Sequence, residues 1–267
     1  MSDTTMQNVL DECVPLIKLL GTGRYAIAIG GSRGKGTSDH TSDVDFRLYC
    51  DEMCFGTMES PNANWDNFVR IVDSWRVRGV EIDHVWIRTI DQINTALDAW
   101  MEGDIQPEIL QWSVWGYHLL PDLFYQQNIE DPYGIVSGWK ERLSVYPAKL
   151  KESILQKHLG SACYWRGDYH YAHKVVRKDP VFLASLSARL VHDLMQVIFA
   201  LNDTYYVGDG SNLEFARHFA IKPADFEERI ISVLYPAPGD ELYARQRQLL
   251  VDLINETESL VSATRPI

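Results

Sequence analysis

Apolar residues in the N-terminal part of the chain change from helical spacing to strand spacing and back. Helical spacing covers residues 6–20, with Pro15 as an expected kink, and Trp65–Arg78. Another helix is expected after Thr89, whose hydroxyl is a candidate N-cap. Short apolar runs between these segments predict three strands: Tyr25–Ile29, Asp43–Tyr49 and Val80–Ile87. The stretch Gly30–Ser42, rich in Gly, Ser and Thr, is expected to be a loop.

The pattern changes after about residue 135, where strand signals nearly vanish. Four amphipathic helices are expected beyond this point: Pro147–Leu159, Pro180–Leu201, Pro223–Leu234 and Glu241–Val261. The second has the clearest signals, because Asp179 is a candidate N-cap and Pro180 fits the first helical position. We therefore expect an α/β domain over residues 1–135 and a helical domain over residues 136–267.

Composition is that of a soluble globular protein, since 46% of the 267 residues are hydrophobic and 23% are charged. No apolar run reaches the roughly 18 residues that a membrane span needs, and no leader with a basic and then an apolar region is visible. We therefore expect a cytoplasmic protein without a membrane partner. Four cysteines are too few for a disulfide scaffold, so we expect reduced thiols.

The net charge of the chain indicates which classes of partner to expect. Acidic residues number 37 and basic residues 25, which gives a formal net charge of −12. Proteins that bind nucleic-acid phosphates usually carry the opposite sign, so a nucleic-acid partner is not expected. A cationic small molecule suits such a protein better. The oligomeric state stays open.

A glycine-rich turn follows the first predicted strand. The segment Gly30–Thr37 reads GGSRGKGT, and its glycines let the backbone turn sharply and bring N–H groups close to a ligand. Ser32 adds a hydroxyl donor, and Arg33 and Lys35 add positive charge. These features predict a phosphate-binding loop, although glycine-rich loops are common.

Two aspartates on the second predicted strand strengthen this interpretation. Asp43 and Asp45 are two positions apart, so their side chains point to the same face of a strand. Neighbouring carboxylates repel unless a cation lies between them, and Mg²⁺ binds one or two carboxylates together with substrate phosphates. The alternating residues Val44, Phe46 and Leu48 are apolar, so the opposite face should belong to the core. We expect a metal site rather than a solvated edge strand.

The third predicted strand adds two more acids. Glu81 and Asp83 are expected on one face, with Val85 and Ile87 beyond them on the same face. That pattern predicts a strand whose first part lines a cleft and carries one functional acid. The spacing alone does not choose between Glu81 and Asp83.

Taken together, these motifs resemble the nucleotidyltransferase superfamily related to DNA polymerase β. The resemblance lies within residues 25–90 and rests on four features in order: a Gly-Gly-Ser turn, a polar loop, the segment Ser42–Asp45 and a later strand carboxylate. The resemblance implies an α+β fold, in which a small mixed sheet with flanking helices precedes an all-α helical bundle. Phe199–Tyr206 and the helix before it are similar to the helical domain of a group of bacterial nucleotidyltransferases of unassigned substrate.

The resemblance also implies roles for individual residues. By resemblance, Gly31 and Ser32 hold a nucleoside triphosphate, expected to be ATP. Lys35, through its charge, and Ser42 are the further candidates for this role. The candidates for binding Mg²⁺ are Asp43, Asp45 and Asp83.

The general base has two candidates. Arg78–Ile82 is similar to the segment with the base glutamate in streptomycin/spectinomycin adenylyltransferases, which favours Glu81. Ile82–Val85 is similar to the third-acid strand of minimal nucleotidyltransferases, which favours Asp83. We take Glu81 as the base, because its longer side chain reaches further into a cleft, and Asp83 as a metal ligand.

The implied reaction is magnesium-dependent transfer of an NMP, expected to be AMP, from an NTP to a hydroxyl group, with release of pyrophosphate. The expected acceptor is a small, cationic molecule such as an aminoglycoside-type antibiotic. Transfer to a protein side chain or to a tRNA is the alternative. A non-catalytic nucleotide-binding module is a third reading, and the retained glycines and acids argue against it.

Overall fold

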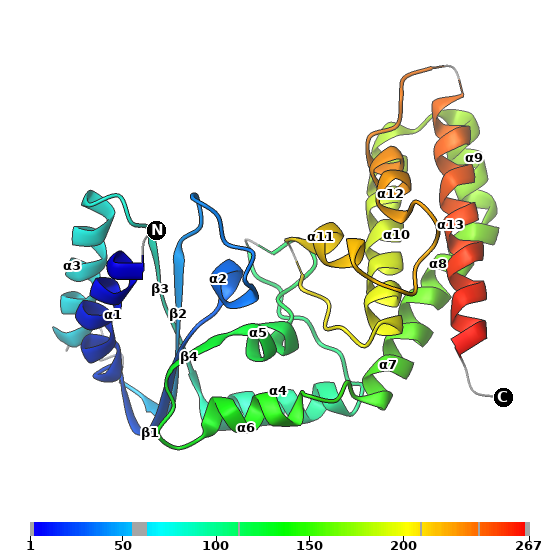
Figure 1. Ribbon diagram of the computed structural model, residues 1–267. Helices are drawn as coiled ribbons and strands as arrows, with labels where there is room; N and C mark the ends of the chain where they lie inside the picture. Colours follow the sequence, from blue (N-terminus) through cyan, green and yellow to red (C-terminus); the bar gives the residue numbers. More distant parts are fainter. Residues whose placement is uncertain (1–2, 55–62, 112, 209, 240, 265–267) are drawn as a thin grey trace. The chain divides into compact units, whose positions relative to one another are not determined.

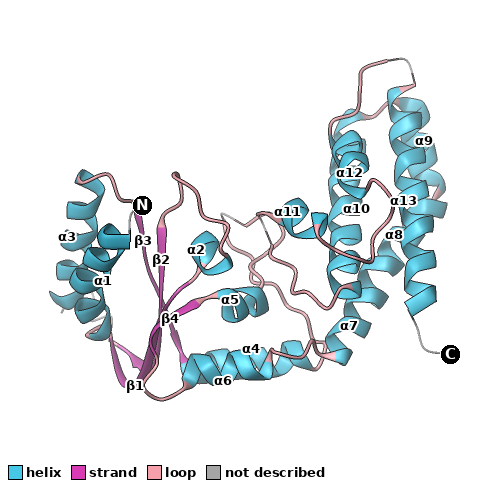
Figure 2. Cartoon of the chain, in the orientation of Figure 1, coloured by secondary structure: helices cyan, strands magenta, loops and turns pink. Residues whose placement is uncertain are grey.

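The computed structural model describes residues 3–54, 63–111, 113–208, 210–239 and 241–264 (Figures 1 and 2). The fold is α+β, with a small mixed sheet and many helices, as expected from the sequence. Strands are confined to the N-terminal half of this described part, which also agrees with the prediction.

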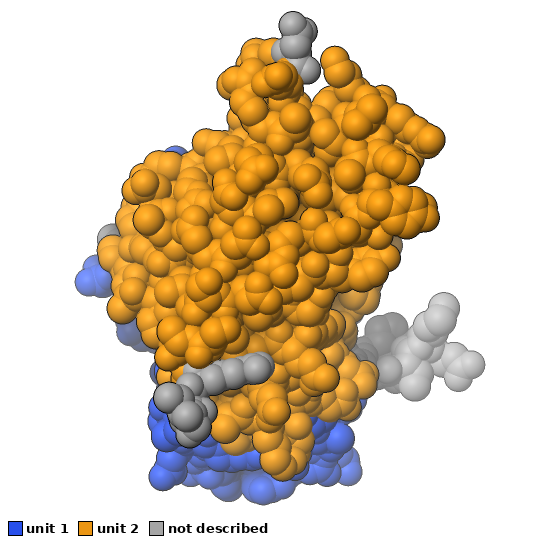
Figure 3. All heavy atoms as spheres, turned by 90° about the vertical axis from the view of Figure 1, so that its right-hand side faces the viewer, with its two compact units in different colours: residues 1–99, 119–145 blue, residues 100–118, 146–267 orange. Residues whose placement is uncertain are grey.

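The chain divides into two compact units, coloured separately in Figure 3. The first unit holds residues 1–99 and 119–145, and the second holds residues 100–118 and 146–267. The border expected between residues 135 and 136 falls inside the first unit. Residues 100–118, which that border assigned to the first domain, group with the second unit.

The first unit is built on a four-stranded sheet among the described residues. Its strands are β1 (Gly21–Ile29), β2 (Val44–Met53), β3 (Ile82–Thr89) and β4 (Gln127–Glu130). Their order is β3-β2-β1-β4; β1 is antiparallel to β2 and β4, whereas β2 and β3 are parallel. The three predicted strands are confirmed, and β4 was not predicted.

The two faces of the sheet differ in chemistry. Helices α1 (Asp3–Lys18) and α3 (Ala63–Val77) pack side by side over one face (Figure 1). The core beneath them takes the alternate β2 residues Val44, Phe46 and Leu48, all fully buried. The opposite face of β2 carries Asp45, Arg47 and Tyr49, so the predicted separation of an apolar face from an acidic one is confirmed.

Two further helices of the first unit, and one that ends two residues beyond its first segment, follow in the chain. They are α4 (Ile90–Met101), α5 (Leu119–Tyr125) and α6 (Ile135–Arg142). Tyr49 packs edge-on against Trp139 of α6, with ring centroids 4.8 Å apart, and the indole of Trp139 donates to Asn94 of α4. Thr89 accepts the backbone N–H of Gln92 (3.2 Å), so the predicted cap of α4 is confirmed.

The alternation expected along β3 is wrong. Val85 and Ile87 were predicted on the face of Asp83, but both belong to the core under α1 and α3. The register explains the difference, because Asp45 lies opposite Asp83 whereas the next pair on that face is Arg47 and Trp86. One extra residue in β3 forms a bulge, which moves the following side chains to the other face.

The second unit is helical, and α10 (Pro180–Leu201) is its core helix. The other helices are α7 (Ala148–Ile154), α8 (Gly160–Gly167), α9 (Tyr169–Arg177), α11 (Asn212–Arg217), α12 (Phe226–Leu234) and α13 (Leu242–Thr264). A π-helical turn, Leu155–Leu159, joins α7 to α8. Asp179 caps α10 by accepting the N–H of Phe182 (3.2 Å), which confirms the cap predicted there.

Helix α10 is long and apolar enough to cross a membrane, by length and composition alone. Most of its apolar window is buried in the helical unit. The core helix of a soluble protein has the same properties, so this feature is weak support for a membrane span.

Candidate functional site

The glycine-rich segment after β1 contains a short helix, α2 (Gly31–Lys35), so a loop over the whole of Gly30–Ser42 is wrong for its first part. The N–H of Gly34 donates to the carbonyl of Gly30 (2.8 Å), and Gly36 ends the helix in the left-handed conformation. The first N–H groups of a helix have no acceptor within the helix. The start of α2 can therefore offer backbone donors to a ligand.

Two consecutive glycines let α2 begin directly against charged side chains. Gly31 has φ +59°, and a Cβ atom there would overlap the carboxylate of Asp45. A Cβ at Gly30 would lie 2.7 Å from Oδ1 of Asp122 and 3.0 Å from Cζ of Arg47. The N–H of Gly30 also donates to the carbonyl of Asp45 (2.9 Å). The neighbouring side chains thus leave no room for a side chain at either position, whatever the turn binds.

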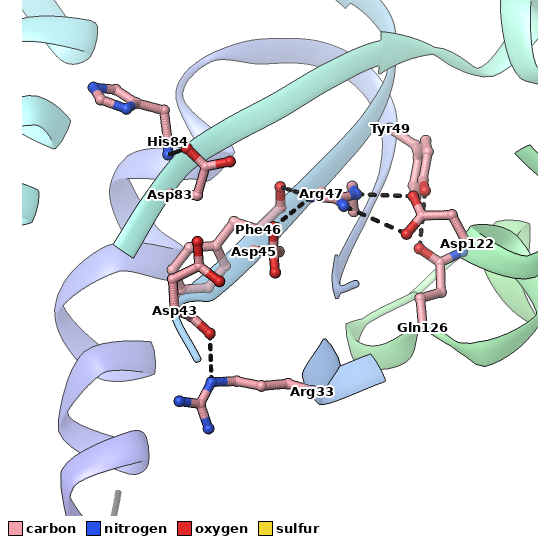
Figure 4. Close-up of polar contacts among 10 residues, drawn as sticks. All are labelled: Arg33, Asp43, Asp45, Phe46, Arg47, Tyr49, Asp83, His84, Asp122 and Gln126. Atoms are coloured by element: carbon pink, nitrogen blue, oxygen red, sulfur yellow. Dashed lines mark hydrogen bonds and ion pairs between the residues drawn. The ribbon is translucent and has the colours of Figure 1, made fainter. Parts of the chain in front are cut away.

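Three aspartates converge beside this turn (Figure 4). Asp43 directly precedes β2, Asp45 lies in β2, and Asp83 faces Asp45 from the parallel strand β3. One carboxylate oxygen from each residue lies within 4.8 Å of the other two. Among the described residues this is the group of acid, histidine and cysteine ligands close enough to share one metal ion. Carboxylate oxygens are the ligands that Mg²⁺ prefers.

The electrostatics of Asp45 favour a cation. Burial raises the pKa of the Asp45 carboxyl to about 6, and Arg47 opposes this shift. The carboxylates of Asp43, Asp83 and Asp122 raise it further. A raised pKa means that the charged form is destabilised by its surroundings. A divalent cation among these oxygens would relieve that destabilisation.

Glu81 lies outside the cluster. Its side chain is exposed and forms an ion pair with Arg76 (3.1 Å). Spacing predicted Glu81 and Asp83 on one face of a strand, but β3 begins at Ile82, so Glu81 precedes the regular alternation. The structure therefore brings Asp83, and not Glu81, to the other two aspartates.

The remaining loop candidates have local partners. The guanidinium of Arg33 donates to the carbonyls of Asp43 and Ser42, both at 2.6 Å. The hydroxyl of Ser42 accepts the N–H of Asp39 (2.9 Å). These contacts make Arg33 and Ser42 part of the frame that holds Asp43. Ser32 and Lys35 lie half-buried in α2, beside the turn.

Sequence reasoning missed a polar network behind the aspartates. Arg47 pairs with Asp122 of α5 (2.9 Å) and lies 3.9 Å from Asp45. At the next position on this face, the hydroxyl of Tyr49 donates to Gln126 (2.9 Å). The alternation of Asp45, Arg47 and Tyr49 is a readable sign of a polar strand face. Asp122 lies 75 positions after Arg47, and no local sequence pattern predicts that these two residues pair.

The cysteines do not contribute to this site. All four lie in the described part of the chain and form no disulfide. Burial raises the pKa of Cys13 to about 12 and that of Cys50 to about 11, so both are protonated thiols near neutral pH. Both belong to the core around the sheet, as expected of structural cysteines.

Comparison with known proteins gives one family match, to a domain of unknown function (DUF4037) over residues 123–209. No curated protein matches the chain. The matched segment begins one residue after Asp122 and runs through α10 to the segment after it. The matched segment contains neither the glycine turn nor the three aspartates, so the match gives no information about the role of these residues.

Proposed function

We propose that this chain is a magnesium-dependent nucleotidyltransferase of the DNA polymerase β-like superfamily. The observation that carries the proposal is the meeting of Asp43, Asp45 and Asp83 beside the glycine turn that opens α2. The carboxylates supply ligands for a hard cation, and the start of α2 supplies donors for phosphate oxygens. A metal–triphosphate substrate needs both sets of groups next to each other.

The residues present fit Mg²⁺, because the donor set is three carboxylates and one of them carries a raised pKa. When bound, Mg²⁺ would neutralise triphosphate oxygens and the leaving pyrophosphate. Asp43, Asp45 and Asp83 would hold it. The first N–H groups of α2 and the hydroxyl of Ser32 would orient the triphosphate, with Lys35 as a further cation beside it.

The transfer forms one bond and breaks one bond. An oxygen of the acceptor hydroxyl bonds to the α-phosphorus, and the bond from that phosphorus to the oxygen bridging to the β-phosphate breaks. The hydroxyl proton passes to a base, and pyrophosphate leaves. The chain's contribution is to align the acceptor hydroxyl and the leaving oxygen on opposite sides of the α-phosphorus.

Asp83 is the third-strand acid that we place in the site, as a metal ligand or as the base. It is exposed, so it can meet an acceptor, and its Oδ1 accepts the N–H of His84 (3.0 Å). Glu81, expected as the base, lies outside the cluster, where it pairs with Arg76, and is left out of the mechanism. Single-turnover rates of Asp83→Asn against Mg²⁺ concentration separate the two roles. A ligand role lowers Mg²⁺ affinity, and a base role lowers the rate at saturating Mg²⁺.

For the acceptor, we propose a hydroxyl group on a small cationic molecule, and for the nucleotide we propose ATP. The net charge of −12 supports a cationic acceptor through long-range attraction. Attraction of this kind weakens as ionic strength rises. Protein side chains and tRNA are the competing acceptors.

The test is an acceptor screen with NTPs labelled at the α-phosphate, in which label transfer and pyrophosphate release are measured together. The panel contains aminoglycosides, other cationic hydroxyl compounds, tRNA and a protein mixture. We expect magnesium-dependent transfer to a small cationic acceptor, its loss in Asp45→Asn, and its survival in Asp51→Asn. Asp51 is a matched control, because it lies on the same strand and pairs with Arg24 (2.9 Å). Transfer that persists in Asp45→Asn would overturn the proposal.

A further inference from the structure

We propose that Arg47 and Asp122 are a positioning pair, which holds the Asp45 carboxylate and the Gly30–Gly31 turn in the arrangement that binds the metal. The inference rests on the proposed function, because it assigns these residues to the same metal site. It adds residues that the sequence motifs do not contain.

The guanidinium of Arg47 uses several nitrogens in different directions (Figure 4). Its Nε and one terminal nitrogen donate to the two carboxylate oxygens of Asp122, at 2.9 and 3.4 Å. Its other terminal nitrogen donates to the carbonyl of Phe46 (3.2 Å) and lies 3.9 Å from the carboxylate of Asp45. A planar guanidinium can satisfy this set at once, whereas a lysine ammonium cannot reproduce its fork.

The pair also lies beside the Gly30–Gly31 turn. A Cβ at Gly30 would lie within 3.0 Å of both Arg47 and Asp122, so the two side chains line the backbone from which α2 starts. Both side chains are almost fully buried, with exposed fractions of 9% and 10%. A buried, two-pronged contact of this kind fixes orientation because neither side chain has room to turn. The same guanidinium thus lies beside the Gly30 position of the turn and 3.9 Å from the carboxylate of Asp45.

The test separates positioning from mere stabilisation. Removing one member of a buried ion pair strands the other charge, whereas replacing both by apolar residues often restores stability. The variants are Arg47→Met, Asp122→Leu and the double variant of both. Each is assayed for thermal unfolding and for Mn²⁺ affinity, with free Mn²⁺ measured by electron paramagnetic resonance in the presence of α,β-methylene-ATP.

We expect both single variants to unfold at lower temperature. We expect the double variant to regain most of that stability and still bind Mn²⁺ at least tenfold more weakly than the wild type. The matched control is Arg24→Met with Asp51→Leu, an exposed arginine–aspartate pair that joins β1 and β2, and it should bind Mn²⁺ like the wild type. A double variant that regains both stability and Mn²⁺ affinity would show a structural role alone and would overturn the inference.

A second variant keeps the test decisive where the double variant fails to fold. Arg47→Lys keeps the charge and loses the fork, so we expect a folded protein with at least tenfold weaker Mn²⁺ binding. Wild-type Mn²⁺ affinity in Arg47→Lys would overturn the inference and leave the proposed function standing. A wild-type protein that binds no Mn²⁺ with the nucleotide would overturn the proposed function together with the inference.

Discussion

Both units contain a buried pair of hydrogen-bonded polar side chains, and the two pairs have different surroundings. Arg47–Asp122 in the first unit has side chains 9% and 10% exposed, and His158–Asp193 in the second has side chains 8% and 6% exposed. Arg47 faces a group of further carboxylates and a backbone turn. His158 faces other rings, including His192 with centroids 5.6 Å apart. The two pairs are therefore equally buried. In the first unit the pair lies among further carboxylates, and in the second unit it lies among aromatic rings.

Buried polar side chains occur in both units, so burial of polar groups alone does not distinguish the acid cluster. The second unit even contains buried polar atoms without a hydrogen-bond partner among the described residues, such as Nε2 of His118 and Oδ2 of Asp193. Its histidines nevertheless do not come close enough, in the described part of the chain, to share a metal ion. The first unit differs because several carboxylates converge on one point beside backbone donors. The convergence of three aspartates beside the Gly30–Gly31 turn is the observation on which the proposed ligand chemistry rests.

The largest expected effect is at the acid cluster. Asp45→Asn should lower turnover by about 10,000-fold, because a lost metal ligand removes several kcal/mol of transition-state stabilisation. The free energy of unfolding should stay the same or rise, since one repelling charge is gone. Turnover with the acceptor found in the screen and urea unfolding measure the two quantities. Unfolding of Asp45→Asn under native conditions would mean that the cluster is structural.

The His158–Asp193 pair of the second unit should show the reverse behaviour, with a loss of stability and no effect on metal binding. His158→Leu should cost about 1–3 kcal/mol of unfolding free energy, because the buried Asp193 side chain loses its hydrogen-bond partner. Replacing both residues by leucine should restore most of this loss. Mn²⁺ affinity of the folded variants should equal that of the wild type. Weaker Mn²⁺ binding by the stable double variant would contradict the account, in which only the pair of the first unit affects the metal site.

Gly31→Ala tests the contact between the turn and Asp45. The new Cβ would overlap the carboxylate, and φ +59° is unfavourable for alanine. We expect a loss of about 1–3 kcal/mol in stability from the strain and about tenfold weaker Mn²⁺ binding, a free-energy change of about 1.4 kcal/mol. Gly36→Ala is the matched control, because Gly36 also has positive φ but no atom within 4 Å of its Cβ position. Equal Mn²⁺ affinities in Gly31→Ala and Gly36→Ala would contradict the claim that the close approach of Gly31 to Asp45 matters for metal binding.

Acid should weaken the second unit through its histidines. Burial lowers the pKa of His118 to about 4 and that of His192 to about 3, whereas an unfolded histidine titrates near 6.5. The unfolded state therefore takes up protons first, so stability is complete above pH 6.5 and declines as the pH falls toward 4. The loss should be about 1–2 kcal/mol per histidine at pH 5. Denaturant unfolding should show a shallower decline in His118→Gln than in His218→Gln, which changes an exposed histidine.

The smallest effect is expected at Glu81. Its exposed ion pair with Arg76 should contribute less than about 0.5 kcal/mol to stability. Glu81→Gln should also retain turnover within about twofold, a change of about 0.4 kcal/mol in the barrier, whereas Asp83→Asn should lose it. Single-turnover rates at saturating Mg²⁺ compare the two variants. A slow Glu81→Gln enzyme with normal Mg²⁺ binding would restore Glu81 as the base.

Much of the fold follows from local patterns. α10 begins where Asp179 and Pro180 predict, because capping and helical spacing act over a few residues. The alternation along β2 likewise predicts which face carries Asp45. The bulge in β3 could not be predicted, because it is defined by register against β2 rather than by its own sequence.

The candidate site divides in the same way. Asp43 and Asp45 can be found from spacing on one strand, whereas Asp83 had to be chosen over Glu81 by the point at which β3 begins. The pairing of Arg47 with Asp122 joins β2 to α5 across 75 positions of sequence, and no sequence pattern near either residue predicts it. The positions of Asp83, Arg47 and Asp122 in the site therefore depend on tertiary packing and cannot be predicted from local sequence.

The most direct test is a crystal structure with Mn²⁺ and α,β-methylene-ATP, in which anomalous scattering locates the metal. We predict a metal peak coordinated by Asp43, Asp45 and Asp83, with the phosphates against the first N–H groups of α2. Ordered nucleotide without metal at these three aspartates, or metal and nucleotide bound elsewhere on the protein, would contradict the proposed site.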